Sequence, residues 1–309
     1  MRPIRIAILG FGKIAADQHV PAIAGNPRFE LVASSSRSGN GVGRTFTDWR
    51  ELIASVESLE AVAITTPPGP RYDMARECLL RGLHCLLEKP PTAGLAEIAD
   101  LACLAEAQQA SLFATWHARH HPAVAAAAQA LAGKRIASME IVWHEDVHKW
   151  HPGQKWIWDP GGFGVFDPGI NALSIATRIF PGALFVQQAE LGIPENAQTP
   201  IAAEIAFSSP EADGPLTASL DWRRSEGEEW TIAVATSDGT RVRLENGGAR
   251  LLLDGEPRHE EGPGEYPDIY REFVDLIDER RSDVDVAPFT LVADCLLVGR
   301  RRTVEPVNG

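Results

Sequence analysis

Short apolar runs alternate with helical patterns through the first 118 residues. The apolar runs lie at Ile4–Leu9, Phe29–Ala33, Glu60–Thr65, Leu83–Leu87 and Ser111–Thr115. Runs of this length are typical of parallel strands that are buried on both faces. Apolar residues at helical spacing occupy Arg71–Arg81 and Leu95–Gln109. Because strands and helices alternate, residues 1–118 are predicted to form a Rossmann-type doubly wound parallel sheet.

From residue 119 onward the strands are longer, and several alternate apolar with polar positions. They are expected at Ser138–Glu145, Phe185–Leu191, Ile201–Ala206, Thr217–Trp222, Trp230–Thr236, Thr240–Leu244 and Ala249–Leu253. This pattern predicts a second, α+β domain over residues 119–309, with a large and mostly antiparallel open sheet that leaves one face free. Helical patterns follow at Tyr266–Asp278 and Leu291–Arg301, and we expect the second of them to return to the first domain.

Composition limits the partners of the chain. Its 309 residues are too many for one typical core, and 44% hydrophobic with 23% charged residues is ordinary for a soluble protein. A net charge of −13 argues against nucleic acid or a membrane surface as a partner. No stretch is long enough to span a membrane, and four cysteines without a CxxC pair suit reduced thiols. We therefore expect a cytoplasmic protein.

A glycine-rich turn follows the first strand. It reads Gly10-Phe11-Gly12-Lys13-Ile14-Ala15, the G-x-G-x-x-A fingerprint of dinucleotide-binding sheets. Gly10 permits a tight turn, Gly12 lets backbone approach a pyrophosphate, and Ala15 lets the next helix pack closely. That helix is expected to be amphipathic, with Ile14 at the start of its apolar face, and to offer its N-terminal amides to the anion.

The second strand leads into Ser34-Ser35-Ser36-Arg37-Ser38, where an NAD enzyme normally places an acid for the ribose hydroxyls. Hydroxyls and a guanidinium suit a 2′-phosphate instead. The alternative is a solvated turn with an incidental arginine. We predict NADP as the preferred cofactor, with NAD also accepted. The cofactor residues that we expect are Gly10, Gly12, Lys13, Ile14, Ser36, Arg37, Thr65, Pro67 and Glu88.

The strand Leu83–Leu87 ends in Glu88-Lys89-Pro90-Pro91, and the prolines forbid its continuation. The carboxyl ends of strands in an open α/β sheet are where ligands bind. Lys89 is therefore placed as a working group, although a surface charge that closes a strand is the simpler interpretation of these residues alone.

The segment 143–171 concentrates tryptophan, histidine, carboxylate and amide side chains. Indole faces together with polar groups suit a polyhydroxylated ligand. A core tryptophan cluster is one alternative and a metal site is another. Because His144 and Glu145 are successive on a strand and point to opposite faces, and the spacing matches no familiar zinc pattern, we expect no metal.

These motifs resemble the Gfo/Idh/MocA family of oxidoreductases over nearly the whole length. The resemblance is carried by G-x-G-x-x-A, by Glu88-Lys89-Pro90 and by Gly161-Gly162-x-x-x-x-Asp167-x-Gly169-x-Asn171. It implies that Lys89 is catalytic, that the Lys89–Pro90 peptide is cis, and that the second domain binds substrate and forms a homodimer through its free sheet face. Many family members have histidine where this chain has Asn171, so an Asp–His pair does not carry over.

Within the family, the stretches at 114–117, 150–154 and 166–171 resemble the aldose 1-dehydrogenases that act on L-arabinose and D-galactose. The resemblance implies that Lys89, Asp167 and Asn171 are catalytic. It implies that the sugar is bound by Glu145, His151, Asp167 and Asn171, in a pocket shaped by His117, Trp150 and Trp230. His117 is expected to end a strand and face the cleft.

The sequence thus predicts an NADP-preferring enzyme that oxidises the C1 hemiacetal of an aldose to a lactone. An inositol or dihydrodiol dehydrogenase of the same family is one alternative. A non-catalytic regulatory protein that senses sugar and nucleotide is another, although such a protein has no need to keep Lys89, Asp167 and Asn171 together.

Overall fold

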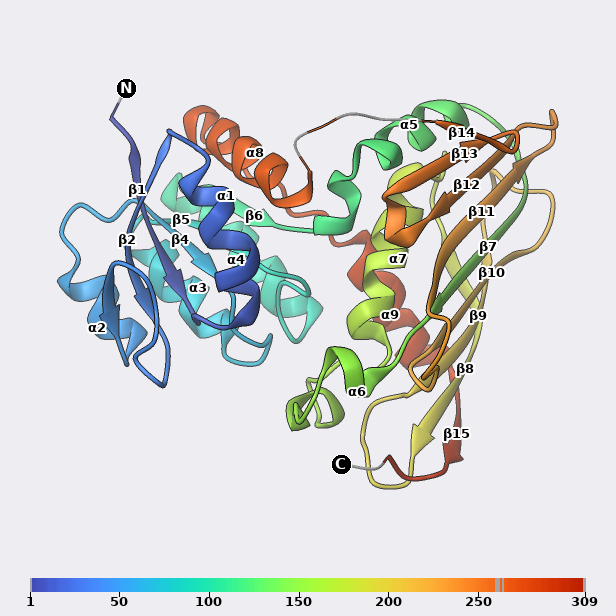
Figure 1. Ribbon diagram of the computed structural model, residues 1–309, viewed down its shortest axis with the longest axis horizontal. Coiled ribbons are helices and arrows are strands. Elements are labelled where there is room, and N and C mark those ends of the chain that lie inside the picture. The colour runs from blue at the N-terminus through green and yellow to red at the C-terminus, as the bar shows by residue number, and fades with distance from the viewer. Residues whose placement is uncertain (1, 259–261, 263, 308–309) are drawn as a thin grey trace. The chain divides into compact units, whose positions relative to one another are not determined.

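The computed structural model describes residues 2–258, 262 and 264–307. The chain divides into two compact units (Figure 1). Unit 1 consists of Met1–His117 and Pro263–Asp285, and unit 2 consists of Ala118–Gly262 and Val286–Gly309. No helix in the described part of the chain is long and apolar enough to cross a membrane.

Unit 1 is built on a parallel sheet of six strands, counted over the described residues. From one edge to the other the strands are β3 (Arg44–Phe46), β2 (Phe29–Ser35), β1 (Ile4–Leu9), β4 (Ala61–Ile64), β5 (His84–Leu87) and β6 (Leu112–Ala114). The order reverses at β1, as in a doubly wound sheet. The predicted fold class of this domain is confirmed, and the continuous apolar runs explain why, since β4 is buried at every position.

Helices cover both faces of this sheet. They are α1 (Val20–Ala24), α2 (Trp49–Ser55), α3 (Arg71–Leu80), α4 (Leu95–Gln108) and α8 (Glu265–Glu279). A core cluster of unit 1 joins Ile6 and Ile8 of β1 to Tyr270 and Phe273 of α8. The helix that returns to the first domain is therefore α8, and the expectation that the last helix would do so is wrong.

Unit 2 contains a mixed sheet of nine strands within the described residues. In spatial order they are β14 (Glu256–Arg258), β13 (Arg250–Leu253), β12 (Arg241–Glu245), β11 (Glu229–Thr236), β7 (Ile136–His144), β10 (Leu216–Asp221), β9 (Ala202–Ser208), β8 (Phe185–Pro194) and β15 (Arg300–Val304). The pairs β10–β7 and β15–β8 are parallel and the other pairs are antiparallel. The predicted large, mostly antiparallel sheet is confirmed.

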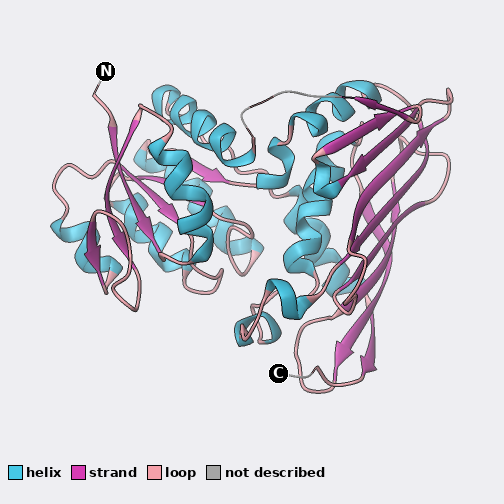
Figure 2. Cartoon of the chain, in the orientation of Figure 1, coloured by secondary structure: helices cyan, strands magenta, loops and turns pink. Residues whose placement is uncertain are grey.

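The described helices of unit 2 lie on one face of this sheet, and none of them lies on the other face (Figure 2). The longer ones are α5 (Pro122–Leu131), α7 (Phe166–Ile179) and α9 (Ala287–Val298). The range predicted for the last helix extends beyond its observed end, because α9 ends at Val298 and the chain then forms edge strand β15.

Helix α7 was not predicted, because Pro168 and Gly169 interrupt its pattern. Proline is tolerated in a first turn, where its missing N–H has no intrahelical acceptor in any case. A Cβ on Gly169 would lie 2.6 Å from Cδ1 of Leu220 on β10. The glycine therefore allows the helix to approach the sheet closely.

Candidate active site

The glycine turn of unit 1 is shaped for a close ligand. Gly10 has φ +98°, and a Cβ there would lie 2.5 Å from Cγ2 of Thr66. The Thr65 hydroxyl donates a 2.8 Å hydrogen bond to the Gly10 carbonyl, which ties the turn after β1 to the end of β4. A Cβ on Gly12 would meet only one carbonyl at 3.9 Å, so its backbone faces open space. The turn fits a pyrophosphate.

The helix after the turn differs from the expectation. Ala15 is fully buried, as predicted, but Ile14 is 38% exposed and does not belong to an apolar face. The segment Ala15–His19 is a π-helix, labelled η1, that continues into α1. Lys13 is exposed and pairs with Asp17.

The turn after β2 carries the groups predicted for a 2′-phosphate. The Ser36 hydroxyl donates a 2.7 Å hydrogen bond to the Asn40 carbonyl, so its proton is not available to donate to a phosphate. Arg37 is exposed and makes no hydrogen bond or ion pair with another described residue. Of the two predicted phosphate ligands, Arg37 is thus the one with uncommitted donors.

Lys89 is partly buried at the end of β5, and the peptide that joins it to Pro90 is cis, as predicted. The guanidinium of buried Arg71 donates to the backbone carbonyls of Thr66, Glu88 and Pro90. Pro67, one of the predicted cofactor residues, is exposed at the surface. Arg71 therefore fixes the backbone on both sides of Lys89, a role that the sequence did not reveal.

Glu88 is buried in a network of hydrogen bonds within unit 1. Its Oε1 lies 3.0 Å from Nε2 of His19 and accepts a 2.6 Å bond from the Tyr266 hydroxyl. Its Oε2 accepts the backbone N–H of Lys89 at 2.9 Å. Burial acts to raise the pKa of Glu88, but the bond and charge of His19 and the Tyr266 hydroxyl together hold it well below its usual range. Glu88 is thus a buried anion that orients the Lys89 backbone.

Two tyrosines one helical turn apart on α8 complete this network. The Tyr270 hydroxyl lies 2.7 Å from Nδ1 of His19. Burial and the nearby Glu88 charge raise the pKa of both Tyr266 and Tyr270 well above the ordinary phenol value, so both keep their protons. Sequence reasoning missed His19, Tyr266 and Tyr270. The usable signal was a pair of tyrosines on the apolar face of a late helix.

His117 lies in a 3₁₀-helix (η2, His117–His120) and not at the end of a strand as expected, because β6 ends at Ala114. Its Nδ1 is 2.9 Å from Oε1 of Glu265. Its ring stacks on Tyr266 with centroids 5.8 Å apart. The ring is therefore oriented by two residues of α8.

In unit 2, Glu145 follows β7 and is buried. Its Oε1 accepts the indole N–H of Trp222 at 3.0 Å, and its Oε2 accepts that of Trp230 at 2.9 Å. The carboxylate therefore fixes two indoles at once. The preceding His144 bonds instead to Ser219, with Nε2 to Oγ at 2.9 Å, which agrees with opposite faces for the two neighbours.

Trp150 ends the short helix α6 (Val147–Trp150) and is 46% exposed. Its ring lies edge-on to Trp230, with centroids 5.8 Å apart. Its indole N–H donates to Oε1 of Glu228 at 2.6 Å. Trp150 and Trp230, both expected to shape the sugar pocket, thus lie together in an aromatic cluster. Glu228 is bonded to Trp150, and Trp222 is linked to Trp230 through Glu145.

The predicted pair Asp167 and Asn171 lies one turn apart on α7, so both side chains leave the same face of the helix. Asp167 is 5% exposed, and its Oδ2 is 3.4 Å from Nε2 of His151. The Asn171 amide is partly buried and makes no side-chain hydrogen bond within the described chain. It can both donate to and accept from a sugar hydroxyl.

A relative that matches this chain over nearly its whole length establishes the family. Galactose 1-dehydrogenase of Pseudomonas fluorescens is 45% identical over 306 residues, which cover 99% of this chain and 99% of that protein. The Gfo/Idh/MocA profile, described as "Oxidoreductase family, NAD-binding Rossmann fold", matches residues 4–115. The chain belongs to the Gfo/Idh/MocA family. The predicted family and its oxidoreductase class are confirmed.

Solved structures share the fold of this chain. A D-galactose-1-dehydrogenase protein from Rhizobium etli is 47% identical, covers 100% of this chain and 99% of its own, and superposes with a TM-score of 0.94. A 3-ketoreductase from Actinomadura kijaniata, solved with TDP-benzene and NADP, is 17% identical with a TM-score of 0.81, and covers 98% of this chain and 99% of its own. At that identity it shows a shared fold alone.

Both units of this Gfo/Idh/MocA protein hold residues whose contacts only the fold could reveal. The missed residues are His19, Arg71, Trp222, Glu228, Glu265, Tyr266 and Tyr270. Most of them contact a residue that the sequence did predict, whereas Tyr270 contacts His19, and most of the bonds join segments far apart in the chain. A local pattern carries no signal for such a pairing.

Proposed function

We propose that the protein is an NADP-preferring aldose 1-dehydrogenase that oxidises the C1 hemiacetal of D-galactose or L-arabinose to the lactone. One observation carries the proposal: the uncommitted Asn171 amide lies one turn from the buried Asp167 carboxylate, which is paired with His151. Such a set of donors and acceptors suits adjacent sugar hydroxyls. The full-length similarity to galactose 1-dehydrogenases supports the substrate class.

The chemistry assigned to this chain is a proton transfer coupled to hydride loss. A bound oxidised nicotinamide supplies the acceptor for the hydride that leaves C1. Lys89, in its neutral form, takes the proton of the C1 hydroxyl, and the C1–O bond becomes the lactone carbonyl. Asp167 accepts a hydrogen bond from the sugar and shares in the proton transfer. Asn171 orients the C1 oxygen without a change of charge.

The remaining sugar contacts are assigned to the aromatic cluster and its neighbours. Trp150 offers an exposed indole face while its N–H is held by Glu228, and such a face suits the C–H surface of a pyranose. We assign Glu145 and His151 to hydroxyl hydrogen bonds, and Trp230 and His117 to the pocket walls.

NADP is the proposed cofactor because the turn after β2 offers Arg37 and lacks an acid. The pyrophosphate is assigned to Gly10, Gly12 and the amides that follow them. A guanidinium with uncommitted donors binds a 2′-phosphate through charge-assisted bonds that a 2′-hydroxyl cannot replace. NAD is expected as the weaker cofactor.

The deciding experiment is a near-ultraviolet assay of reduced nicotinamide with a panel of aldoses, inositols and dihydrodiols, each with NADP and NAD. Turnover of D-galactose and L-arabinose with NADP supports the proposal. Turnover of an inositol or a diol alone favours the related dehydrogenases. Binding of sugar without turnover of any compound would favour a regulatory protein.

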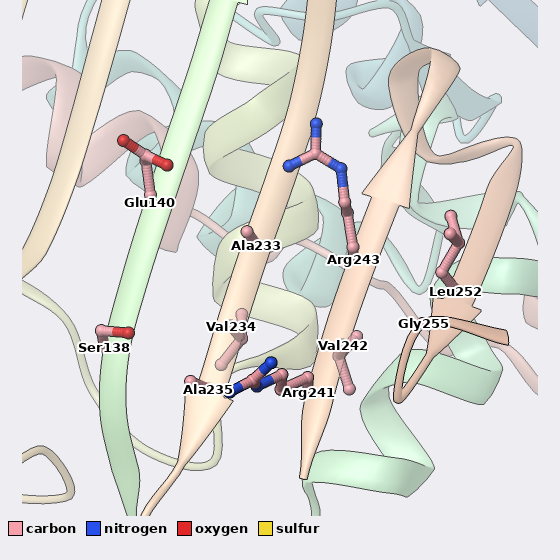
Figure 3. Close-up of a pocket in the computed structure, with 10 residues that line it drawn as sticks. All are labelled: Ser138, Glu140, Ala233, Val234, Ala235, Arg241, Val242, Arg243, Leu252 and Gly255. Carbon is pink, nitrogen blue, oxygen red and sulfur yellow. The ribbon is translucent and has the colours of Figure 1, made fainter. Parts of the chain in front are cut away.

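We also propose a cytoplasmic homodimer formed through the helix-free face of the unit 2 sheet. On this face a hollow of about 310 Å³ lies over β7, β11 and β12. Figure 3 shows Glu140 on β7 and Arg243 on β12 flanking Ala233 on β11. Small side chains beside charges of both signs allow the same face of a second copy to pair with it.

A further inference from the structure

Glu228 lies in the loop between β10 and β11 and is not one of the predicted site residues. Its side chain is only 18% exposed. It receives hydrogen bonds from one short segment of the chain. Oε1 accepts the Trp150 indole N–H at 2.6 Å, and Oε2 accepts Nζ of Lys149 at 2.5 Å. Burial acts to raise the pKa of Glu228, but these bonds and the Asp146 backbone lower it below its usual value, so the carboxylate is ionised at neutral pH.

The two ends of α6 are held differently. At its start, the Val147 N–H bonds to the Trp222 carbonyl at 3.1 Å, a main-chain contact with the end of β10. At its other end, the Trp150 ring contacts Trp230 and its only hydrogen-bonded side-chain partner in the described chain is Glu228. Glu228 is therefore the polar anchor of the end that presents the indole.

The hydrogen bond between Glu228 and Trp150 affects the proposed sugar site in two ways. An indole whose N–H is satisfied presents an apolar face, so its orientation decides whether it can cover a sugar. The next residue, His151, is bonded through its backbone N–H to the Val147 carbonyl at 2.8 Å and through its ring to Asp167. A shift of the Trp150 end would therefore also move His151, which is assigned to a hydrogen bond with a sugar hydroxyl.

We infer that Glu228 is a positioning residue for sugar binding: its carboxylate fixes the end of α6 so that the Trp150 indole face and His151 are presented to the aldose. This rests on the proposed function. Because the contact is to the non-reacting part of the sugar, its loss removes binding shared by ground state and transition state. Such a loss raises KM and leaves kcat nearly unchanged.

The test compares three variants with the wild-type protein. Glu228→Ala removes both acceptors. Glu228→Gln keeps an oxygen for the Trp150 N–H while it removes the charge. Glu226→Ala removes an exposed carboxylate from the same loop and serves as the matched control. KM and kcat for D-galactose are measured at saturating NADP, and hydrogen exchange of the amides at 147–151 is followed in the free protein.

We expect Glu228→Ala to raise KM about tenfold, which is the scale of one hydrogen bond to a charged group. Its kcat should stay within about twofold. Glu228→Gln should stay within about threefold of wild type in KM, because Lys149 is more than half exposed and water weakens its ion pair with Glu228. Glu226→Ala should match wild type. Amide exchange at Trp150 and His151 should be faster in Glu228→Ala alone.

The inference is overturned if Glu228→Ala matches Glu226→Ala in both KM and exchange, or if Glu228→Gln is as impaired as Glu228→Ala. A wild-type protein that oxidises no aldose overturns the proposed function instead. In that case the exchange rates still decide whether Glu228 fixes the end of α6, since they need no substrate.

Discussion

The phenolic hydroxyl of Tyr266 donates a 2.6 Å hydrogen bond to Oε1 of Glu88 across 178 residues of sequence. The bond joins α8 to the end of β5, where the cis Lys89–Pro90 peptide begins. With His19 it keeps a carboxylate ionised in a buried place, where a lone charge would be very costly. The tertiary contact therefore maintains the charge beside the proposed catalytic lysine.

This relationship predicts how stability depends on pH. Because the folded-state pKa of Glu88 lies below its usual value, the stabilisation is fully present above the ordinary carboxyl pKa of ~4.3 and is lost as pH falls from there toward the folded value. Tyr266→Phe removes one donor and should cost about 1.5–3 kcal/mol of unfolding free energy at neutral pH. It should also shift acid unfolding, followed by circular dichroism, to higher pH.

The matched control for Tyr266→Phe is Tyr72→Phe. The Tyr72 hydroxyl also donates to a carboxylate, Asp100, at 2.8 Å, but on the surface. Water replaces that bond, so Tyr72→Phe should leave the acid midpoint unchanged. An acid midpoint that is equal in Tyr266→Phe and wild type would show that Tyr266 does not stabilise the Glu88 anion.

Sequence reasoning recovered the first domain well because its strands are continuous apolar runs. It missed β3 and α2, which are short, and it missed α7, because a proline and a glycine that packing requires hide the helical period. Candidate site residues could be chosen from the sequence where a residue type carries the chemistry, as at Lys89 and Asp167, and their roles stay predictions. The sequence did not reveal the partners of Glu88 and Trp150, because these partners, Tyr266 and Glu228, come from other elements.

Cofactor preference should depend on Arg37 far more than on Ser36. Arg37→Ala should raise KM for NADP at least about tenfold, because a charge-assisted contact to phosphate is lost, and should leave KM for NAD nearly unchanged. Ser36→Ala should have a smaller effect, since its hydroxyl proton is already donated to the Asn40 carbonyl. Steady-state kinetics with both cofactors checks this. Equal losses with NADP and NAD in Arg37→Ala would refute the assignment.

Gly169 should be required for the placement of Asp167 and Asn171. In Gly169→Ala the new Cβ would lie 2.6 Å from Cδ1 of Leu220, and such overpacking typically costs about 1–3 kcal/mol. Thermal unfolding should show this loss, together with a lower kcat as α7 shifts. The double variant Gly169→Ala, Leu220→Ala should recover part of the kcat, because it makes room for the methyl group.

Gly69→Ala is the control for that substitution, since a Cβ at Gly69 meets nothing within 4 Å and its φ is not positive. It should leave both stability and kcat close to wild type. Gly169→Ala with wild-type stability would mean that α7 does not need its close approach to β10.

The proposed homodimer should be visible by sedimentation at micromolar protein concentration. Glu140→Arg places a third cation beside Arg241 and Arg243 on the free sheet face, so like charges would meet across a twofold interface. The variant should sediment as a monomer at concentrations where wild type is a dimer. A wild-type monomer at these concentrations would exclude the dimer, and a dimeric Glu140→Arg protein would place the interface elsewhere.

The chemistry itself should depend on Lys89. Removal of a general base typically costs about 10²–10⁴-fold in rate, so Lys89→Ala should lower kcat for D-galactose by that order. Binding of NADPH, followed by its fluorescence, should persist, because Gly10, Gly12 and Arg37 are unchanged. Far-ultraviolet circular dichroism confirms that the variant is folded.

Asp167→Asn distinguishes the two groups that could take the proton. If Lys89 is the base, Asp167→Asn should raise KM for the sugar and lower kcat by less than Lys89→Ala does, since the amide still accepts a hydrogen bond but cannot share the proton. If Lys89→Ala instead keeps near-wild-type kcat across the pH range, Lys89 is not the base. Asp167, held by His151 on the first turn of α7, would then be the group that accepts the proton.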